Sequence, residues 1–525
     1  MTGLDTANKV LKVVKNKQVQ KWVIGSVIAM ILGFLLNVLV FKAALKKDYG
    51  YCGYVLWIAI CFIVFFLCQM RAIAIKRMEM VFAVIALILG VFYIAVSPAT
   101  VGVSWDDEVH YGRTVSLLSY LSGGKYYYAD EDQITSYQNT IASYTDEQKS
   151  GFNRENRRNV SEKTNREYSE KVKGNNPQGY ESFSSIAYIP AALGILSGRI
   201  LRLSWVACFN LGRFFNLLCY VFVTSLAIKK LHSGKLLCAL VGLIPSTIFM
   251  AGSYSYDPWV ISWSLLGFAE FFNAVADDDQ KISVKQWMKM LLTFAVGFLP
   301  KMVYVVTLFP LLFVKSEKFE NPKKALALKM AVILMAVLLA LSYFVPEMIR
   351  GALAVGDSRG GTNVSTIGQM HFILAHSGNV ASIILHFFIQ YAGLSIVPYT
   401  QLYAYLGIGS FDAIIFILLF TSIFLENTPE HKVPFAIKLT GIIGLILGVF
   451  SVIMSMYMSF NPVGAQTIAG VQNRYLFPLF FPLGYYLIPR NGRIKWEKEN
   501  VAVYPIAAFA FSFIYNVYTL CIVYY

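Results

Sequence analysis

The chain has 525 residues, of which 57% are hydrophobic and 14% charged, with a formal net charge of +15 and a mean hydropathy of +0.56. An ordinary soluble domain is about 45–50% apolar and about 25% charged. This composition excludes such a domain, because too few polar residues remain to cover its surface, and it excludes a disordered chain. The charge would favour nucleic-acid binding only if the basic residues formed one face.

Long apolar runs indicate helices that cross a membrane, because such a helix needs about 20 apolar residues. The strongest runs are Trp22–Phe41, Tyr54–Gln69, Met80–Ser97, Trp205–Ile228, Leu236–Gly252, Trp259–Val275, Ala327–Val345, Phe411–Leu425, Phe435–Tyr457, Tyr475–Ile488 and Val501–Val523. Two shorter runs, Trp287–Leu299 and Met302–Val314, flank Pro300. They predict either a pair of short spans or one broken helix.

The positive charge lies between these runs. Nearly all of it falls in the clusters Lys9–Lys21, Arg71–Arg77, Lys229–Lys235, Lys315–Lys329 and Arg490–Lys498. Counting the spans in order places all five clusters on one side, and the positive-inside rule makes that side cytoplasmic. The charge is therefore a signal of topology, and we expect no nucleic-acid partner.

This count places residues 346–376 and 398–410 outside. The run Ala381–Val397 is short and contains His386 and Gln390, so we expect an interfacial or re-entrant helix there. The prediction is an all-α, multi-pass membrane protein of roughly 13 spans, with its N-terminus in the cytoplasm and its C-terminus outside.

The chain divides into six parts by this topology. They are a tail with two extra spans (1–79), a first core span (80–97), a large outer loop (98–204), a transmembrane core (205–345), a second outer loop with the interfacial helix (346–410) and the C-terminal spans (411–525).

An acidic motif opens the large outer loop. Asp106, Asp107 and Glu108 are followed by His110 and Arg113. If this segment is helical, Asp106, His110 and Arg113 share one face, while Asp107 points about 100° away from Asp106. A carboxylate here suits a general base that deprotonates a hydroxyl group. The alternative is that the acidic triplet only begins a helix, where carboxylates favour the positive end of the dipole.

Other charged residues fall on the same predicted side. Asp257 begins a span, which also suits a helix cap. Lys301 follows Pro300 in an apolar stretch, and Arg474 with Tyr475 precedes the next span. Both cations suit phosphate binding, although Lys301 could instead snorkel to the interface and Arg474 could anchor there. The sequence requires no cofactor. A divalent cation, Mg²⁺ or Mn²⁺, stays an alternative, with Asp106, Asp107 and Asp257 as its candidate ligands.

The motifs resemble a known family. Trp-Asp-Asp-Glu-Val-His-Tyr-Gly-Arg at 105–113 resembles the Asp-Glu-x-x-His motif of the bacterial membrane family called domain of unknown function 2142, with Asp107 where Glu is usual. Gln-Asn-Arg-Tyr at 472–475 resembles its Gln-Gly-Arg-Tyr motif, with Asn473 in place of Gly. The segments 253–257 and 299–301 stand where its Asp and Lys segments are expected, and the resemblance runs from about Val81 to Ile488.

That family in turn resembles the glycosyltransferase C superfamily. The resemblance implies a membrane enzyme that takes sugars from polyprenyl-phosphate carriers, with a large first outer loop. It implies Asp106 or Asp107 as base, with Glu108 and His110 shaping the site. Arg113, Lys301 and Arg474 would neutralise the lipid phosphate, beside Asp257 and Tyr475.

We therefore expect an inverting glycosyltransferase in the bacterial plasma membrane, acting at the outer face in cell-wall or polysaccharide synthesis. Its partners would be a lipid-linked sugar donor, a glycan or glycolipid acceptor and membrane lipid. Two alternatives stay open at this point. One is a transporter or flippase of lipid-linked sugars, which predicts polar residues at mid-membrane on several helices. The other is a non-catalytic protein of cell-envelope assembly.

Overall fold

The computed structural model describes residues 17–124, 153–170, 183–276, 280–349, 351, 360–361, 363–394, 402, 411–425, 433–489, 501–523 and 525. Throughout this part of the chain the regular structure is helical. The only β-type pairings among these residues are two isolated bridges, Ile282 with Phe319 and Val364 with Pro462. Helices suit an apolar chain in a membrane because they satisfy every backbone hydrogen bond within one segment.

Eight helices in the described part are long and apolar enough to cross a membrane. They are α2 continued by η1 (Lys17–Leu36 and Asn37–Ala44), α3 (Gly50–Met70), α4 (Met78–Val96), α10 (Trp205–Lys230), α13 (Asp257–Ala276), α15 (Ala325–Ile349), α20 (Phe435–Phe460) and α23 continued by η11 (Val503–Val517 and Tyr518–Ile522). The described part of the chain is therefore helical, with several candidate membrane spans, as the sequence predicts.

The other predicted spans form shorter helices. They are α11 with α12 (Lys235–Gly242 and Pro245–Ala251), α14 (Val284–Phe298), η5 (Met302–Phe313), α19 (Asp412–Leu425) and α21 (Phe477–Leu487). Proline explains part of this shortening, because it lacks the backbone N–H that continues a helix. Pro245 begins α12, and Pro310 lies inside η5, a 3₁₀ helix. The total of roughly 13 membrane spans, which includes these shorter helices, therefore stays a prediction.

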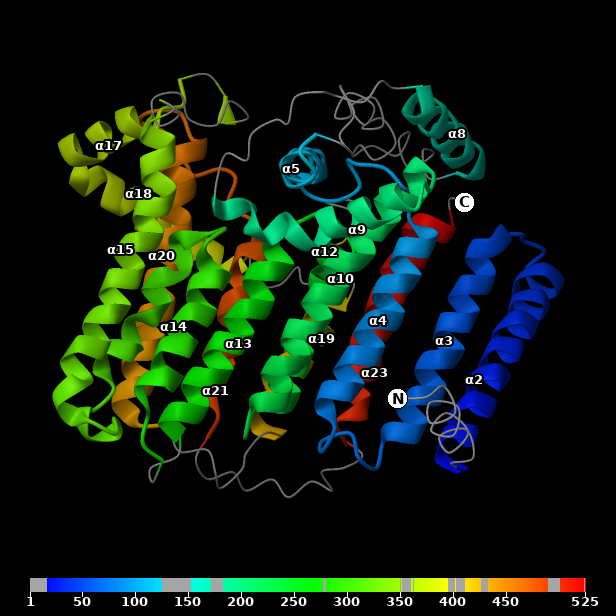
Figure 1. The fold of residues 1–525 in the computed structure, drawn as a ribbon, viewed down its shortest axis with the longest axis horizontal. Coiled ribbons are helices and arrows are strands. Elements are labelled where there is room, and N and C mark those ends of the chain that lie inside the picture. The colour runs from blue at the N-terminus through cyan, green and yellow to red at the C-terminus, as the bar shows by residue number, and fades with distance from the viewer. Residues whose placement is uncertain are drawn as a thin grey trace.

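The predicted interfacial helix coincides with a bent helix pair. Helix α17 (Thr366–Ala375) meets α18 (Ser377–Leu394) at an angle of 109°, which fits a broken span or a re-entrant loop. Both helices lie beside α20 (Figure 1). The last three residues of the predicted segment 381–397 fall outside the described residues, as do nearly all of 398–410.

Basic turns mark one end of the bundle. The connections after α3 and α10, and the short 3₁₀ helices η6 (Ser316–Lys318) and η7 (Pro322–Lys324), lie at the end where α2 begins (Figure 1). Tyr525 lies near the other end. The described parts of the basic clusters thus share one face, as the charge count predicts. The clusters within 1–16 and 490–500 lie outside the described residues.

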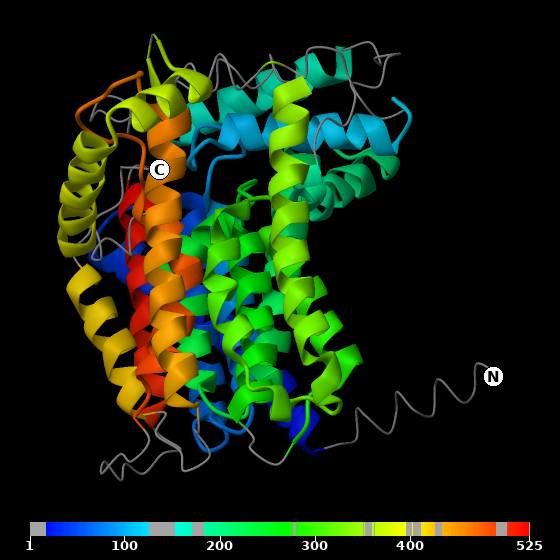
Figure 2. The same ribbon diagram turned by 90° about the vertical axis from the view of Figure 1, so that its left-hand side faces the viewer.

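Several helices lie across the other end of the bundle, which we call the α5 face. They are α5 (Asp107–Leu121), α8 (Arg154–Glu170), η4 (Phe183–Tyr188) and α9 (Ile189–Ile200), and Figure 2 shows α5 running nearly perpendicular to the upright helices. Residues 125–152 and 171–182 of the large outer loop lie outside the described residues, and α8 lies between these two segments in sequence.

A small apolar core fixes α5 to the bundle. It joins Tyr111 and Leu118 of α5 to Tyr188, to Trp205 of α10 and to Tyr254. Burying side chains of this size contributes roughly 1.5–3 kcal/mol each, so this core holds α5 against the bundle. Helix α9 packs against α10 so closely that a Cβ on Gly194 would lie 2.3 Å from the Leu211 carbonyl oxygen. The helices of the α5 face are therefore packed against the bundle as an integral part of the fold.

Helix α8 is tied to the ends of two spans. The buried Arg157 side chain donates to the carbonyl oxygens of Val96, at the end of α4, and of Cys521, near the C-terminus. Carbonyl groups at a helix C-terminus lack partners within the helix, and an arginine suits them in charge and hydrogen bonding. Arg157 thus satisfies both ends and holds α8 above them.

Candidate functional site

The acidic motif is divided by a single backbone reversal. Asp106 has a left-handed conformation, with φ of 54°, and caps α5, which begins at Asp107. Aspartate tolerates this conformation better than most residues, although it costs roughly 1 kcal/mol. The reversal turns the side chains of Asp106 and Asp107 to different sides of the segment. Two neighbouring carboxylates therefore enter different surroundings.

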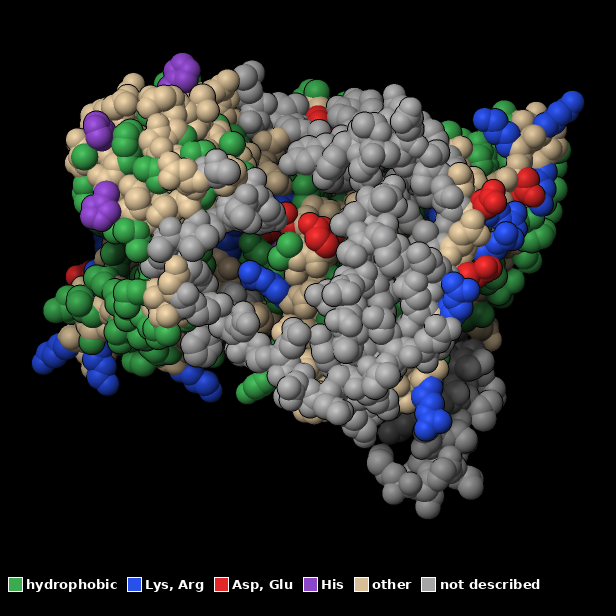
Figure 3. Space-filling view, turned by 90° about the horizontal axis from the view of Figure 1, so that it is seen from above, with side chains coloured by type: hydrophobic (Ala, Val, Ile, Leu, Met, Phe, Trp, Pro, Cys, Tyr) green, Lys and Arg blue, Asp and Glu red, His purple; other side chains and the backbone are tan. Residues whose placement is uncertain are grey.

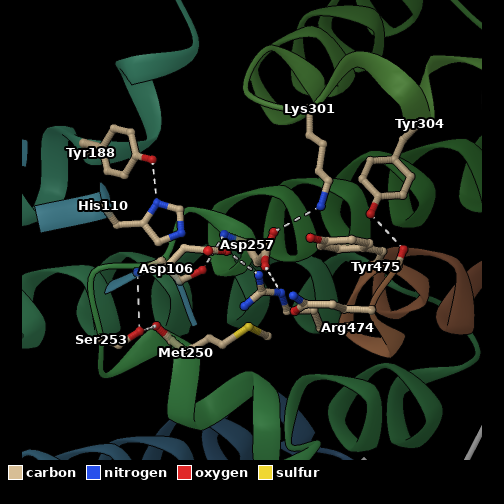
Figure 4. A network of polar contacts seen from close by, with 12 residues as sticks. Asp106, His110, Tyr188, Met250, Ser253, Asp257, Lys301, Tyr304, Arg474 and Tyr475 are labelled. Carbon is tan, nitrogen blue, oxygen red and sulfur yellow. Dashed lines mark hydrogen bonds and ion pairs between the residues drawn. The ribbon is translucent and has the colours of Figure 1, made fainter. Parts of the chain in front are cut away.

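Asp106 belongs to a chain of alternating charges. Arg474 Nη2 donates to Asp106 Oδ2 at 2.8 Å, and Arg474 Nε lies 3.3 Å from Asp257 Oδ2. Lys301 Nζ lies 3.6 Å from the other oxygen of Asp257. Figure 4 shows these four side chains pointing toward one another from α5, from the short 3₁₀ helix η10 (Asn473–Leu476), from the start of α13 and from the break between α14 and η5.

Asp106 is the most exposed of these four side chains. The side chains of Arg474, Asp257 and Lys301 are 5%, 10% and 15% exposed, whereas that of Asp106 is 32% exposed. Asp106 is thus the member of the chain that a molecule from outside meets. Viewed onto the α5 face, acidic and basic side chains gather in its middle (Figure 3).

Aromatic rings surround the two cations. Lys301 Nζ lies 3.4 Å from the ring centre of Tyr475, with the rings of Tyr256 and Tyr304 at 5.8 and 6.0 Å. The Arg474 guanidinium lies 5.2 Å from the Trp105 ring. Such cation–π contacts stabilise a cation by roughly 0.5–2 kcal/mol without supplying a hydrogen-bond acceptor.

Both cations retain unused donors. Arg474 Nη1 and Lys301 Nζ are buried and make no hydrogen bond within the part of the chain that the structure describes. A buried charged donor without an acceptor is costly, and native structures satisfy nearly all such groups. The arrangement therefore suits an anion that accepts from Arg474 Nη1 and Lys301 Nζ.

His110 lies on the same side as Asp106. Its Nδ1 shares a hydrogen bond of 2.8 Å with the hydroxyl group of Tyr188, and its ring meets that of Tyr256 edge-on. Burial lowers the pKa of His110 to about 4, against the opposing effect of the Asp106 charge. The imidazole is therefore neutral at pH 7 and serves as a fixed hydrogen-bonding group.

Asp107 does not join this cluster, which corrects its predicted place in the site. Both its side chain and that of Arg213 are 0% exposed, and the closest charged atoms of the two lie 4.0 Å apart. Arg213 also donates to the carbonyl oxygens of Pro98 and Thr100, at 2.9 and 3.0 Å. Burial raises the pKa of Asp107 to about 6, and the Arg213 charge opposes this shift. The Asp107–Arg213 pair therefore ties the motif to α10.

Glu108 and Arg113 also lie apart from the cluster centre. Both are exposed on α5. Glu108 thus does not line the buried site, contrary to its predicted role. Arg113 interacts with the hydroxyl group of Tyr188, which in turn bonds His110, so it lies at the rim.

The predicted cation ligands are not assembled. Asp107 faces Arg213, and Arg474 bridges Asp106 and Asp257 where a metal ion would stand. No group of three or more His, Cys, Asp or Glu side chains that could hold a metal occurs among the described residues. Asp106 and Asp257 are thus paired with Arg474 and Lys301 rather than with each other.

The comparisons with known proteins concern the region that builds this site. A family model described as "Predicted membrane protein (DUF2142)" matches residues 96–483. The chain belongs to this family. No curated protein and no solved structure matches it. The matched region of this DUF2142 protein includes α5, Asp257, Lys301 and η10, whereas α2, α3 and α23 lie outside it.

Sequence reasoning missed the aromatic and hydrogen-bonding members of the site. Tyr256 and Tyr304 flank Asp257 and Lys301 in sequence, so their proximity was a usable signal. Tyr188 lies 78 residues from His110, and no sequence pattern links the two. The pairing of Asp107 with Arg213 within α10 was not foreseen either.

Proposed function

We propose that this DUF2142 protein is a glycosyltransferase that moves a sugar from a polyprenyl-phosphate carrier to an acceptor hydroxyl group. The transfer would invert the anomeric carbon and would take place where the outer face of the plasma membrane meets water. One observation carries the proposal. Two buried cations with unused donors, Arg474 and Lys301, lie beside the partly exposed carboxylate of Asp106. A lipid phosphate and a hydroxyl acceptor need this combination of groups.

The reaction assigns a role to each charged group. The acceptor oxygen attacks the anomeric carbon of the sugar, and the bond between that carbon and the phosphate oxygen breaks. The electron pair of this bond stays on the lipid phosphate, whose developing charge is stabilised by Arg474 and Lys301. Asp106 accepts the proton of the acceptor hydroxyl group.

Arg474 links binding to activation in this proposal. In the structure Arg474 holds both Asp106 and Asp257. A phosphate that accepts from Nη1 competes for the guanidinium group and weakens its hold on Asp106. A carboxylate with a weaker cationic partner is a stronger base. Donor binding would therefore prepare Asp106 to take the proton.

His110 and the rings shape the pocket. Neutral His110 offers a hydrogen bond to a sugar hydroxyl without adding charge, and Trp105 and Tyr256 offer apolar ring faces. Arg113 at the rim would attract the anionic donor. The charge pattern favours a site on the side of the membrane away from the cytoplasm. The acceptor there would be a glycan or glycolipid outside the bacterial plasma membrane.

The test measures turnover of synthetic polyprenyl-phosphate sugars by the purified protein in vesicles. The quantity measured is the polyprenyl phosphate that is released. We expect Asp106→Asn to lower the rate by about 10²–10⁴-fold, the usual contribution of a general base. Glu108→Gln is the matched control, since it neutralises an exposed acid two residues away, and it should change the rate by less than about threefold.

A second measurement, of lipid movement between leaflets, distinguishes the enzyme proposal from the transporter alternative. If the wild-type protein releases no polyprenyl phosphate from any donor, yet moves the donor lipid between leaflets, the protein is a transporter and the enzyme proposal is wrong. Equal rates for wild type and Asp106→Asn would remove Asp106 from the role of base.

A further inference from the structure

A charged cavity lies at the opposite end of the bundle from the α5 face. It has a volume of about 310 Å³ and is formed where α10 and α13 end and α14 begins. Small-molecule sites occupy about 300–1,000 Å³, so this cavity suits a compact group. The acid–base chain around Asp106 plays no part in it.

One carboxylate organises two lysines on the wall of this cavity. Glu270 Oε1 lies 2.9 Å from Lys230 Nζ and 3.0 Å from Lys289 Nζ, and Thr293 donates to Oε2 at 3.1 Å. The Glu270 side chain is 12% exposed, whereas those of Lys230 and Lys289 are 36% and 58% exposed. Glu270 therefore acts as a buried anchor that holds two ammonium groups together at an open surface.

The lysines retain capacity for a ligand. An ammonium group has three N–H donors, and Glu270 takes one from each lysine. Lys281, whose Nζ donates to the Glu317 carbonyl oxygen, adds a third cation to the wall. The cavity wall thus carries three lysines and one glutamate, of which Lys230 and Lys289 contact the Glu270 carboxylate. Two ammonium groups that share one carboxylate oxygen repel each other, and a bound anion relieves this repulsion.

We propose that this cavity binds a phosphate ester through Lys230, Lys281 and Lys289. The ester could belong to an anionic lipid headgroup or to a soluble phosphorylated metabolite, since both present the same oxygens to the lysines. Phosphate suits the site because its oxygens accept from several ammonium groups at once. The apolar walls, which include Ala274 and Met290, would contact the ester's organic part.

Two probes test the proposal on the full chain and distinguish the sources. One is sn-glycerol 3-phosphate, titrated against the detergent-purified protein in a calorimeter. The other is phosphatidylglycerol, with phosphatidylcholine for comparison, whose retention is measured by native mass spectrometry. Saturable binding of either probe is expected, and the probe that binds shows whether the ester belongs to a soluble metabolite or to a lipid. The proposal is wrong if neither probe binds saturably.

Matched double variants locate the binding. Lys230→Gln/Lys289→Gln should weaken it by at least about tenfold, because two charge-assisted hydrogen bonds are lost. Lys229→Gln/Lys285→Gln removes the same charge from exposed lysines next to them and should change it by less than about twofold. Equal affinity in the two double variants would contradict the proposal, and would assign the binding to the other face.

Discussion

Asp106 and Asp107 are adjacent in sequence, and each faces an arginine, yet their surroundings differ. The Asp106–Arg474 pair lies at the mouth of the site, with a short contact of 2.8 Å and an Asp106 side chain that is 32% exposed. The Asp107–Arg213 pair is fully buried, and its charged atoms are 4.0 Å apart. The comparison teaches that like residues in one motif can divide their roles between binding and folding.

The partners explain this division. Arg213 donates from both Nη1 and Nη2 to backbone carbonyl groups, so these two donors are committed to the fold. Arg474 keeps Nη1 without an acceptor among the described residues, so it can still bind a ligand. A buried pair is costly to break because one charge is left unpaired, whereas a partly exposed charge is relieved by water.

The largest effect on stability is expected from breaking the buried pair. Arg213→Met leaves Asp107 buried without its cation and should destabilise the protein by about 3–5 kcal/mol. Apparent melting temperature in detergent measures this. The double variant Arg213→Met/Asp107→Leu should recover much of the loss, because no lone charge remains. If the double variant is no more stable than the single one, Asp107–Arg213 is not a coupled pair.

The pH dependence of stability should separate Asp107 from His110. The pKa of Asp107 is raised from 3.8 to about 6, so its contribution is fully present below pH 4 and is lost as pH rises through 6. The pKa of His110 is lowered from 6.5 to about 4, so its contribution is present above pH 6.5 and is lost as pH falls through 4. Each change is on the order of 3 kcal/mol.

Melting temperatures between pH 4 and 6.5 check these signs. Relative to Asp107→Asn, the wild type should lose stability as pH rises over this interval. Relative to His110→Gln, it should gain stability. Comparison with each variant removes the titration of all other groups. If the plot of melting temperature against pH for a variant runs parallel to that of the wild type, burial does not shift the pKa of the replaced residue as described.

Breaking the exposed pair should cost little stability. Asp106→Asn leaves Arg474 with Asp257, so we expect a loss of about 1 kcal/mol or less, despite its large expected effect on turnover. The same melting experiment measures it. A loss as large as that of Arg213→Met would mean that Asp106 serves the fold, and the contrast between the two aspartates would disappear.

The smallest effect is expected from the third acid of the motif. Glu108 is exposed on α5, so Glu108→Gln should change stability by less than about 0.5 kcal/mol. Circular dichroism melting suffices to measure this. A clear destabilisation would reveal a contact of Glu108 that matters to the fold.

Much of the architecture followed from apolar runs and charge. The long helices, the common face of the described basic turns and the family were predicted, because hydropathy and the side preference of lysine act locally along the chain. The shortened helices were less predictable. Composition does not show where a proline-containing run such as Met302–Val314 becomes a 3₁₀ helix rather than a span.

The candidate site was predicted in part. Six predicted residues do come together, because charged side chains at one end of an apolar bundle avoid both lipid and the apolar core. They are Asp106, His110, Asp257, Lys301, Arg474 and Tyr475. Asp107 and Glu108 were grouped with them only because they are neighbours in sequence. The enzymatic role stays a proposal.

The sequence by itself determined the class of protein, the face on which its basic turns lie and which residue types a polar site could contain. Only the tertiary structure decided which aspartate faces the site. That choice depends on one left-handed residue, Asp106, and on arginines 106 and 368 positions away in the chain. Such contacts are set by how helices pack, and local sequence patterns do not record them.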